Sequence, residues 1–215
     1  MFDRDNTLVV DVPYNGDPAL VEPMPGAVEA LARLRAHGIP VGVVSNQSGI
    51  GRGLITRDQV DAVNARVAEL LGPFDVWEIC PHVAADGCEC RKPRPGMLLS
   101  AARFLGIDPE DMVFIGDIGA DMGAAAAAGC RGILVPTDIT LREEVAAAEV
   151  VAADITRAVS ICLGEHPASD AAIDVAPDVN LESGLGATPV VPSEATSDLA
   201  SADLASAETR SGGRR

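Results

Sequence analysis

The stretch Asp3-Arg4-Asp5-Asn6-Thr7 follows a short apolar start, and the rest of the chain is best interpreted around it. On an extended segment leaving a strand, side chains two residues apart share one side, so Asp3 and Asp5 lie about 6 to 7 Å apart along the backbone. Two carboxylates in different environments acquire different pKa values, so one can attack while the other transfers protons. A solvated turn rich in Asp and Asn has the same composition, and the stretch alone favours that interpretation.

Apolar runs alternate with helical patterns through most of the chain. Runs at 39–44, 74–79, 112–115 and 132–135 predict strands, and helical spacing predicts helices over 26–35, 56–71, 97–105 and 122–128. This alternation predicts an α/β fold, a Rossmann-like parallel sheet with helices on both faces. Met1 and Phe2 are too few for a first strand, which needs roughly five residues. We therefore expect a shortened central strand or a truncated start.

Local signals refine this pattern. The segments 56–59 and 140–143 both match a capping box at a helix start. The segment 13–25 contains four prolines and predicts a turn and flap. Ligands of open α/β sheets bind outside the carboxyl ends of the strands. Because the polar segments 3–7, 45–53 and 116–121 each follow a predicted strand, we expect them to open onto one crevice.

Composition limits the classes of partner. The 215 residues carry a formal charge of −16, from 32 acids and 16 bases, which argues against a nucleic-acid or membrane partner. The chain has no apolar run of 18 residues and lacks the features of a signal peptide, so we expect a cytoplasmic location. We also expect a monomer. Residues 1–164 predict one domain, and the acidic, low-complexity segment 165–215 predicts a disordered tail.

Four of the metal-binding side chains are crowded into one short segment. Cys80, His82, Cys88 and Cys90 offer three thiolates and one imidazole, which is the ligand set of a tetrahedral structural zinc. The alternative, buried small cysteines, fits poorly because Pro81, Asp86 and Gly87 are typical of an exposed turn. Zinc would order this loop and thereby fix the residues that follow it. Cys130 and Cys162 are interpreted as small apolar core residues.

Four motifs occur in order along the chain: Asp3-x-Asp5-x-Thr7, Ser45 after a strand, Lys92, and Gly116-Asp117 with Asp121. In order and strand context they resemble the motifs of the haloacid dehalogenase superfamily of phosphotransferases, over about residues 1 to 160. The segments 45–53, 80–82, 88–93 and 95–97 resemble its zinc-containing subgroup, whose members act on heptose bisphosphates or on histidinol phosphate. The chain departs from the family motif at Asn6, where family members usually have Gly. Asn tolerates the left-handed backbone that such a turn needs.

The resemblance implies a role for each residue. Asp3 is expected to be the nucleophile that forms an aspartyl-phosphate, and Asp5 the acid and base. Mg²⁺ is expected on Asp3, the Asp5 carbonyl and Asp117, with Lys92 neutralising phosphoryl charge. The other expected contacts to phosphate or substrate come from Ser45, Asn46, Gln47, Arg52 and Arg91, with Arg94 as a further candidate. Asp121 is either an outer ligand or a helix-start residue.

The expected function is Mg²⁺-dependent hydrolysis of a small phosphate monoester, foremost a heptose bisphosphate. No segment is long enough for a large cap domain, so the site should be open. Histidinol phosphate is the alternative substrate. A different class, a catalytically impaired zinc-containing binding module, is suggested by Asn6 and the short start. A polynucleotide 3′-phosphatase shares the Asn-Gln-x-Gly-Ile loop pattern, but the acidic charge argues against it.

Overall fold

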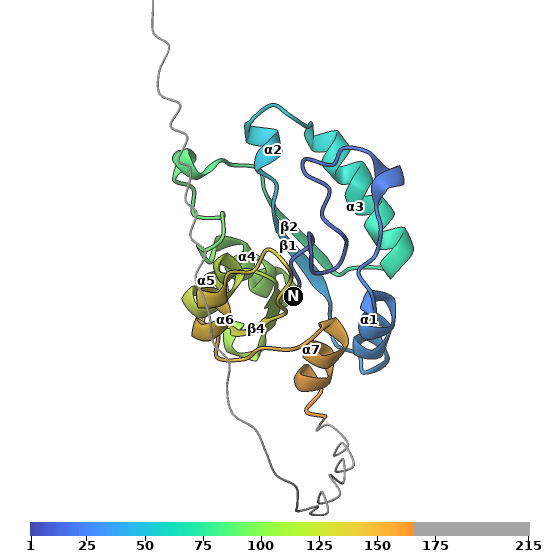
Figure 1. Cartoon of the computed structure of the whole chain (residues 1–215), viewed down its shortest axis with the longest axis vertical. Helices are drawn as coiled ribbons and strands as arrows, with labels where there is room; N and C mark the ends of the chain where they lie inside the picture. Colours follow the sequence, from blue (N-terminus) through green and yellow to red (C-terminus); the bar gives the residue numbers. More distant parts are fainter. Residues whose placement is uncertain (166–215) are drawn as a thin grey trace, which may run out of the picture. The chain divides into compact units, whose positions relative to one another are not determined.

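The computed structural model describes residues 1–165, so the predicted tail lies outside the described residues apart from Glu165 (Figure 1). The strands are β1 (Gly42–Asn46), β2 (Val76–Cys80), β3 (Val113–Gly116) and β4 (Arg131–Leu134). The α-helices are α1 (Ala27–Ala36), α2 (Ser48–Gly51), α3 (Arg57–Leu71), α4 (Gly96–Leu105), α5 (Gly119–Ala128), α6 (Arg142–Ala147) and α7 (Ile155–Cys162). Short 3-10 helices lie at η1 (Pro18–Leu20), η2 (Ala84–Asp86) and η3 (Pro109–Asp111).

The strands form the predicted parallel sheet. β1 pairs in parallel with β2, and β3 pairs in parallel with β4. Phe2 joins the two pairs, because it bridges Val43 on one side and Ile115 on the other, both in parallel. Val151 extends the far edge through a parallel bridge to Leu134. The order across the sheet is therefore β2, β1, Phe2, β3, β4 and Val151.

The central strand is as short as the sequence predicts, yet it is hydrogen-bonded on both sides. The Phe2 N–H donates to Gly42 O at 2.9 Å, the Asp3 N–H donates to Ile115 O at 2.9 Å, and Val44 and Ile115 donate to the carbonyls of Phe2 and Met1 at 2.8 and 3.0 Å. Phe2 is only 1% exposed. The backbone of Asp3 is thus fixed between β1 and β3 despite the brevity of the strand.

Helices cover both faces of the sheet, as predicted. Neighbouring strand residues point to opposite faces. Val43 and Ile115 belong to the core shared with α1 and α7, whereas Val44 and Phe114 belong to the core shared with α4 and α5. Figure 1 shows α1, α3 and α7 on one side of the sheet and α4, α5 and α6 on the other.

Two expectations about the C-terminal third need correction. The predicted capping box at 140–143 is wrong by one residue: α6 begins at Arg142, and the Leu141 N–H donates to the Glu144 carboxylate at 3.0 Å. Helix α7 was not predicted, although Ile155, Ala158 and Val159 have helical spacing and are buried. None of the helices within residues 1–165 combines the length and hydropathy needed to span a bilayer.

Candidate active site and metal centre

The three polar segments expected at the strand ends meet at one cavity of about 370 Å³. Its walls include Asp3, Asp5, Ser45, Lys92 and Asp117. Each residue lies at the carboxyl end of a strand or in the loop that follows that strand. The prediction that these strand ends open onto one crevice is therefore confirmed.

Lys92 is the buried cation of this site. Its Nζ lies 2.7 Å from Asp3 Oδ1 and 2.6 Å from Asp121 Oδ1, and it donates to Val44 O at 3.1 Å. Only 4% of Lys92 is exposed. Lys92 is therefore not a solvated surface lysine.

The carboxylates outnumber the cation. Burial raises the pKa of Asp3 to about 8 against the opposing effect of Lys92, and burial together with the Asp121 charge raises the pKa of Asp117 to about 7. One oxygen from each of these three acids lies within 4.8 Å of the others. When all three acids are ionised, one lysine leaves two negative charges uncompensated, and hard oxygen ligands of this kind fit a divalent ion such as Mg²⁺.

Asp121 is a helix-start residue, and its role as an outer metal ligand stays a prediction. It is the third residue of α5, where its Oδ2 accepts from the Ile118 N–H at 3.2 Å, while Oδ1 faces Lys92. The carboxylate packs directly over Gly116, where an added Cβ would lie 2.4 Å from Asp121 Oδ2. The glycine of the Gly116-Asp117 motif therefore makes room for this acid.

Asp117 is held from the loop after β4. The Thr140 hydroxyl donates to Asp117 O at 2.6 Å, and the Thr137 hydroxyl donates to Asp117 Oδ2 at 3.4 Å. The Thr137 N–H in turn donates to the Thr140 hydroxyl at 2.8 Å. Thr140 thus serves the acid rather than capping α6.

Asp5 has a different set of partners from Asp3. Gln47 Nε2 donates to Asp5 Oδ2 and to Ser45 Oγ, both at 2.8 Å. Arg4 Nε donates to Asp5 Oδ1 at 3.0 Å, and Arg4 Nη2 donates to Asp5 Oδ2 at 3.2 Å. The two acids of the motif therefore belong to separate ion pairs, Asp3 with Lys92 and Asp5 with Arg4.

The loop residues predicted to bind substrate are distributed around the cavity. The Asn46 side chain accepts from the Lys92 N–H at 3.1 Å and donates to Lys92 O at 3.3 Å, so it fixes that backbone. Asn46, Gln47 and Arg91 line the cavity. Arg52 is exposed at the end of α2 and is not among the lining residues, so its role stays a prediction. Arg94 donates instead to Gly87 O and to Cys88 O.

Asn6 keeps the turn intact. Its backbone is left-handed, with φ of 57°, and its N–H donates to Val9 O at 2.7 Å. Its side-chain oxygen accepts from the Asp11 N–H at 3.3 Å, two residues before the proline-rich flap begins. Tyr14 of this flap, also left-handed with φ of 53°, lines the cavity. The flap therefore forms one wall of the site.

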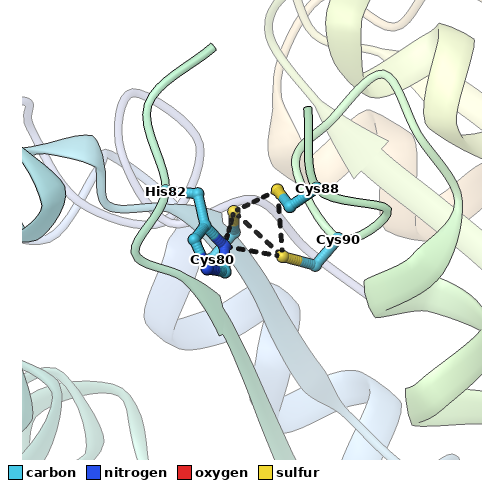
Figure 2. Close-up of side chains that lie close together, drawn as sticks. All are labelled: Cys80, His82, Cys88 and Cys90. Atoms are coloured by element: carbon cyan, nitrogen blue, oxygen red, sulfur yellow. Dashed lines mark hydrogen bonds between the residues drawn. The ribbon is translucent and has the colours of Figure 1, made fainter. Parts of the chain in front are cut away.

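The predicted zinc ligands converge, as Figure 2 shows. Sulfur separations are 3.2 Å from Cys90 to Cys80, 3.3 Å from Cys90 to Cys88 and 3.7 Å from Cys80 to Cys88. His82 Nδ1 lies 3.2 Å from Cys90 and 3.6 Å from Cys80. A tetrahedral Zn²⁺ with ordinary bond lengths needs about 3.8 Å between sulfurs and about 3.5 Å from sulfur to nitrogen. The sulfur separations are about 0.1 to 0.6 Å shorter than this ideal, while the number and kind of donors fit zinc, and all four ligands predicted from the spacing lie together.

The residues of the site that were not predicted include Arg4, Asn64, Thr137 and Thr140. Thr140 follows β4, so the rule of strand ends would have found it. Asn64 interrupts the apolar stripe of α3 between Val63 and Val67, and Arg4 separates the two acids. A polar residue on a buried helix face is a signal for a buried partner.

The comparisons with known proteins agree with this geometry. A family model described as haloacid dehalogenase-like hydrolase matches residues 5–129. The chain belongs to this family of hydrolases, and it is an enzyme of the phosphatase type.

Among its relatives, the D-glycero-beta-D-manno-heptose-1,7-bisphosphate 7-phosphatase of Pseudomonas aeruginosa is 42% identical over 54% of this chain and 67% of that protein. The enzyme of the same name from Vibrio cholerae is 38% identical over 73% of this chain and 90% of that protein. The crystal structure of D,D-heptose 1,7-bisphosphate phosphatase from Bordetella bronchiseptica, complexed with magnesium and phosphate, has a TM-score of 0.68 and 32% identity, covering 77% of this chain and 97% of that one.

Proposed function

We propose that this phosphatase hydrolyses one phosphate ester of a heptose bisphosphate through an aspartyl-phosphate on Asp3. The observation that carries the proposal is the pairing of two acids with separate partners at the floor of one cavity. Asp3 is buried beside Lys92, and Asp5 reaches the same cavity with 27% of its side chain exposed. This separation suits one acid to attack and the other to proton transfer.

Asp3 and Asp5 have different roles in the two half-reactions. Asp3 Oδ1 is engaged by Lys92 and by the Arg4 N–H, and within the described residues no hydrogen bond reaches Oδ2. Oδ2 attacks phosphorus, the ester P–O bond breaks, and the departing alkoxide takes a proton from Asp5. Asp5 then removes a proton from water, whose oxygen attacks the same phosphorus and releases phosphate and the free Asp3 carboxylate.

Two metals complete the proposal. Asp3, the Asp5 carbonyl and Asp117 would hold Mg²⁺, and Asp121 would support them from α5. When bound there, Mg²⁺ would supply positive charge that offsets the negative charge of the phosphoryl group. Cys80, His82, Cys88 and Cys90 would hold a structural Zn²⁺, which would fix the loop that ends at Arg91 and Lys92.

The substrate class rests on the relatives and on the shape of the site. The names of the relatives specify a heptose bisphosphate as their substrate. The cavity holds about 370 Å³, enough for a sugar phosphate but small for a polymer, and Ser45 and Arg91 on its wall offer donors to phosphoryl oxygens. A cytoplasmic location and a monomeric state stay predictions.

The test is phosphate release from four substrates: the α and β anomers of D-glycero-D-manno-heptose 1,7-bisphosphate, histidinol phosphate and a 3′-phosphorylated oligonucleotide. Each is assayed in buffer with and without added Mg²⁺, without a chelator, so that zinc is retained. We expect Mg²⁺-dependent turnover of a heptose bisphosphate. Turnover confined to histidinol phosphate or to the oligonucleotide would replace the substrate, and a folded, zinc-loaded protein that is inactive on all four would favour a binding module.

A further inference from the structure

Arg4 lies between the two acids and lines the cavity, and its side-chain donors are directed at Asp5 and Asn64. Its side chain is 3% exposed, whereas the Asp5 side chain is 27% exposed. A buried guanidinium is costly unless its donors are paired. Arg4 meets this requirement with two side chains, one on each side of its planar group.

We propose that Arg4 is a positioning residue that orients the Asp5 carboxylate, and that Asn64 holds Arg4 in place. The inference rests on the proposed function, because it assigns a role only if Asp5 transfers protons. Neither Arg4 nor Asn64 needs to contact substrate for this role.

The contacts form a chain from helix to acid. Arg4 Nη1 donates to Asn64 Oδ1 at 2.9 Å, and Asn64 is 7% exposed on the buried side of α3. The opposite edge of the guanidinium forms a two-bond fork on Asp5, at 3.0 and 3.2 Å. A planar fork fixes the plane of a carboxylate as well as its distance, which the point charge of a lysine cannot do.

The fork and Gln47 together constrain Asp5 from the protein side. Gln47 Nε2 donates to Asp5 Oδ2 at 2.8 Å, so the carboxylate accepts from two side chains of different loops. The exposed part of Asp5 is then directed at the cavity, where the leaving oxygen of a phosphate ester would lie. Because a displacement of about 1 Å can cost roughly a hundredfold in rate, this orientation is the function that Arg4 supplies.

The experiment compares two leaving groups. The alkoxide of a heptose bisphosphate needs a proton as it departs, whereas the nitrophenolate of p-nitrophenyl phosphate leaves without one. The ratio kcat/KM reports the steps up to release of the leaving group, so it isolates this difference. Arg4→Met is measured with both substrates, beside Asp5→Asn as the reference for lost proton donation and Arg57→Met as a matched arginine control on the exposed face of α3.

We expect Arg4→Met to lower kcat/KM about 10- to 100-fold for the heptose bisphosphate and several-fold less for p-nitrophenyl phosphate, in the pattern of Asp5→Asn. Arg4→Lys should restore only part of the kcat/KM lost with the heptose bisphosphate. Asn64→Leu should also lower kcat/KM more for the heptose bisphosphate than for p-nitrophenyl phosphate, but by a smaller factor. An equal loss with both substrates, or a loss seen only as a lower Tm, would mean that Arg4 is merely structural and would overturn the proposal.

A crystal structure of Arg4→Met gives a second answer that does not depend on turnover. A displaced Asp5 carboxylate beside an unchanged Asp3 and Lys92 supports the positioning role, and an unmoved Asp5 overturns it. The two proposals fail separately. An inactive unmodified protein counts against the proposed function, whereas an active protein whose Arg4→Met variant loses both substrates equally counts only against Arg4.

Discussion

The acidic centre and the Cys/His loop are both suited to hold a cation, but the chain assembles them in opposite ways. The ligands of the loop lie within residues 80–90, and three of them, His82, Cys88 and Cys90, are partly exposed. The acids come from two distant parts of the chain, after Phe2 and after β3, and Asp3, Asp117 and Asp121 are buried. A local ligand set folds around its metal, whereas a distributed set is positioned by the fold first.

The chemistry of the two sites differs accordingly. Thiolates and imidazole suit a metal that stays in place, and carboxylate oxygens suit an ion that exchanges with solvent and substrate. Loss of a ligand in the acidic centre should therefore affect rate more than stability. Loss of a ligand in the Cys/His loop should affect stability first.

Asp3→Asn should give the largest effect. Because the amide cannot form the aspartyl-phosphate, we expect phosphate release to fall at least about 10⁴-fold while zinc content and the far-UV CD spectrum stay unchanged. The control is Asp61→Asn, an exposed acid on α3 that should keep full activity. Substantial activity in Asp3→Asn would exclude Asp3 as the nucleophile.

Cys90→Ser should affect stability more than rate. Removing one thiolate weakens zinc, and we expect zinc content to fall below half an equivalent and Tm to fall by roughly 5 to 10 °C, a loss of a few kcal/mol. Activity should decrease through the displaced Lys92, but less than in Asp3→Asn. Cys162→Ser, a half-buried cysteine outside the loop, is the matched control; an equal fall in zinc content there would contradict the assignment.

Thr140→Val should have a smaller effect, confined to the acidic centre. It removes the donor to Asp117 O, and a hydrogen bond worth about 1 kcal/mol corresponds to roughly fivefold weaker activation by Mg²⁺. The Mg²⁺ dependence of the rate measures this change. Thr140→Ser retains the hydroxyl and should show the same Mg²⁺ dependence as the unmodified protein. If Thr140→Ser needed as much Mg²⁺ as Thr140→Val, the effect would come from packing and not from the hydrogen bond.

The smallest effect is a pH dependence of magnesium stabilisation. Asp3 and Asp117 have raised pKa values, about 8 and about 7, so the Mg²⁺-free folded protein retains protons that the unfolded chain releases near pH 4. Its stability therefore falls as pH rises from about 4 to 8. Mg²⁺ replaces those protons, so the rise in Tm on adding Mg²⁺ should be larger at about pH 8.5 than at about pH 6. Equal shifts at both pH values would contradict the raised pKa values.

The same contrast explains what could be predicted from sequence. The Cys/His ligands are predictable because their spacing lies within one loop. Asp3 and Asp117 are predictable because parallel strands end at one edge, whereas Lys92 was predicted from its place among the ordered family motifs. Asn64 is not, because a helix packed from elsewhere brings it to Arg4, and Thr140 was assigned to α6 because a local capping pattern competed with a tertiary contact. The brief central strand was predicted, but its complete hydrogen bonding depends on two distant strands.

That strand has a consequence for folding. Phe2 can pair with Val43 only when a loop of about 40 residues closes, and with Ile115 only when one of more than about 110 residues closes. Contacts so distant in sequence slow folding. The two halves of the sheet meet through the residue next to Asp3, so the nucleophile is positioned only when both loops have closed. The return of phosphatase activity after refolding should therefore follow the slowest step of assembly, and partly folded chains should be inactive towards cellular phosphate esters.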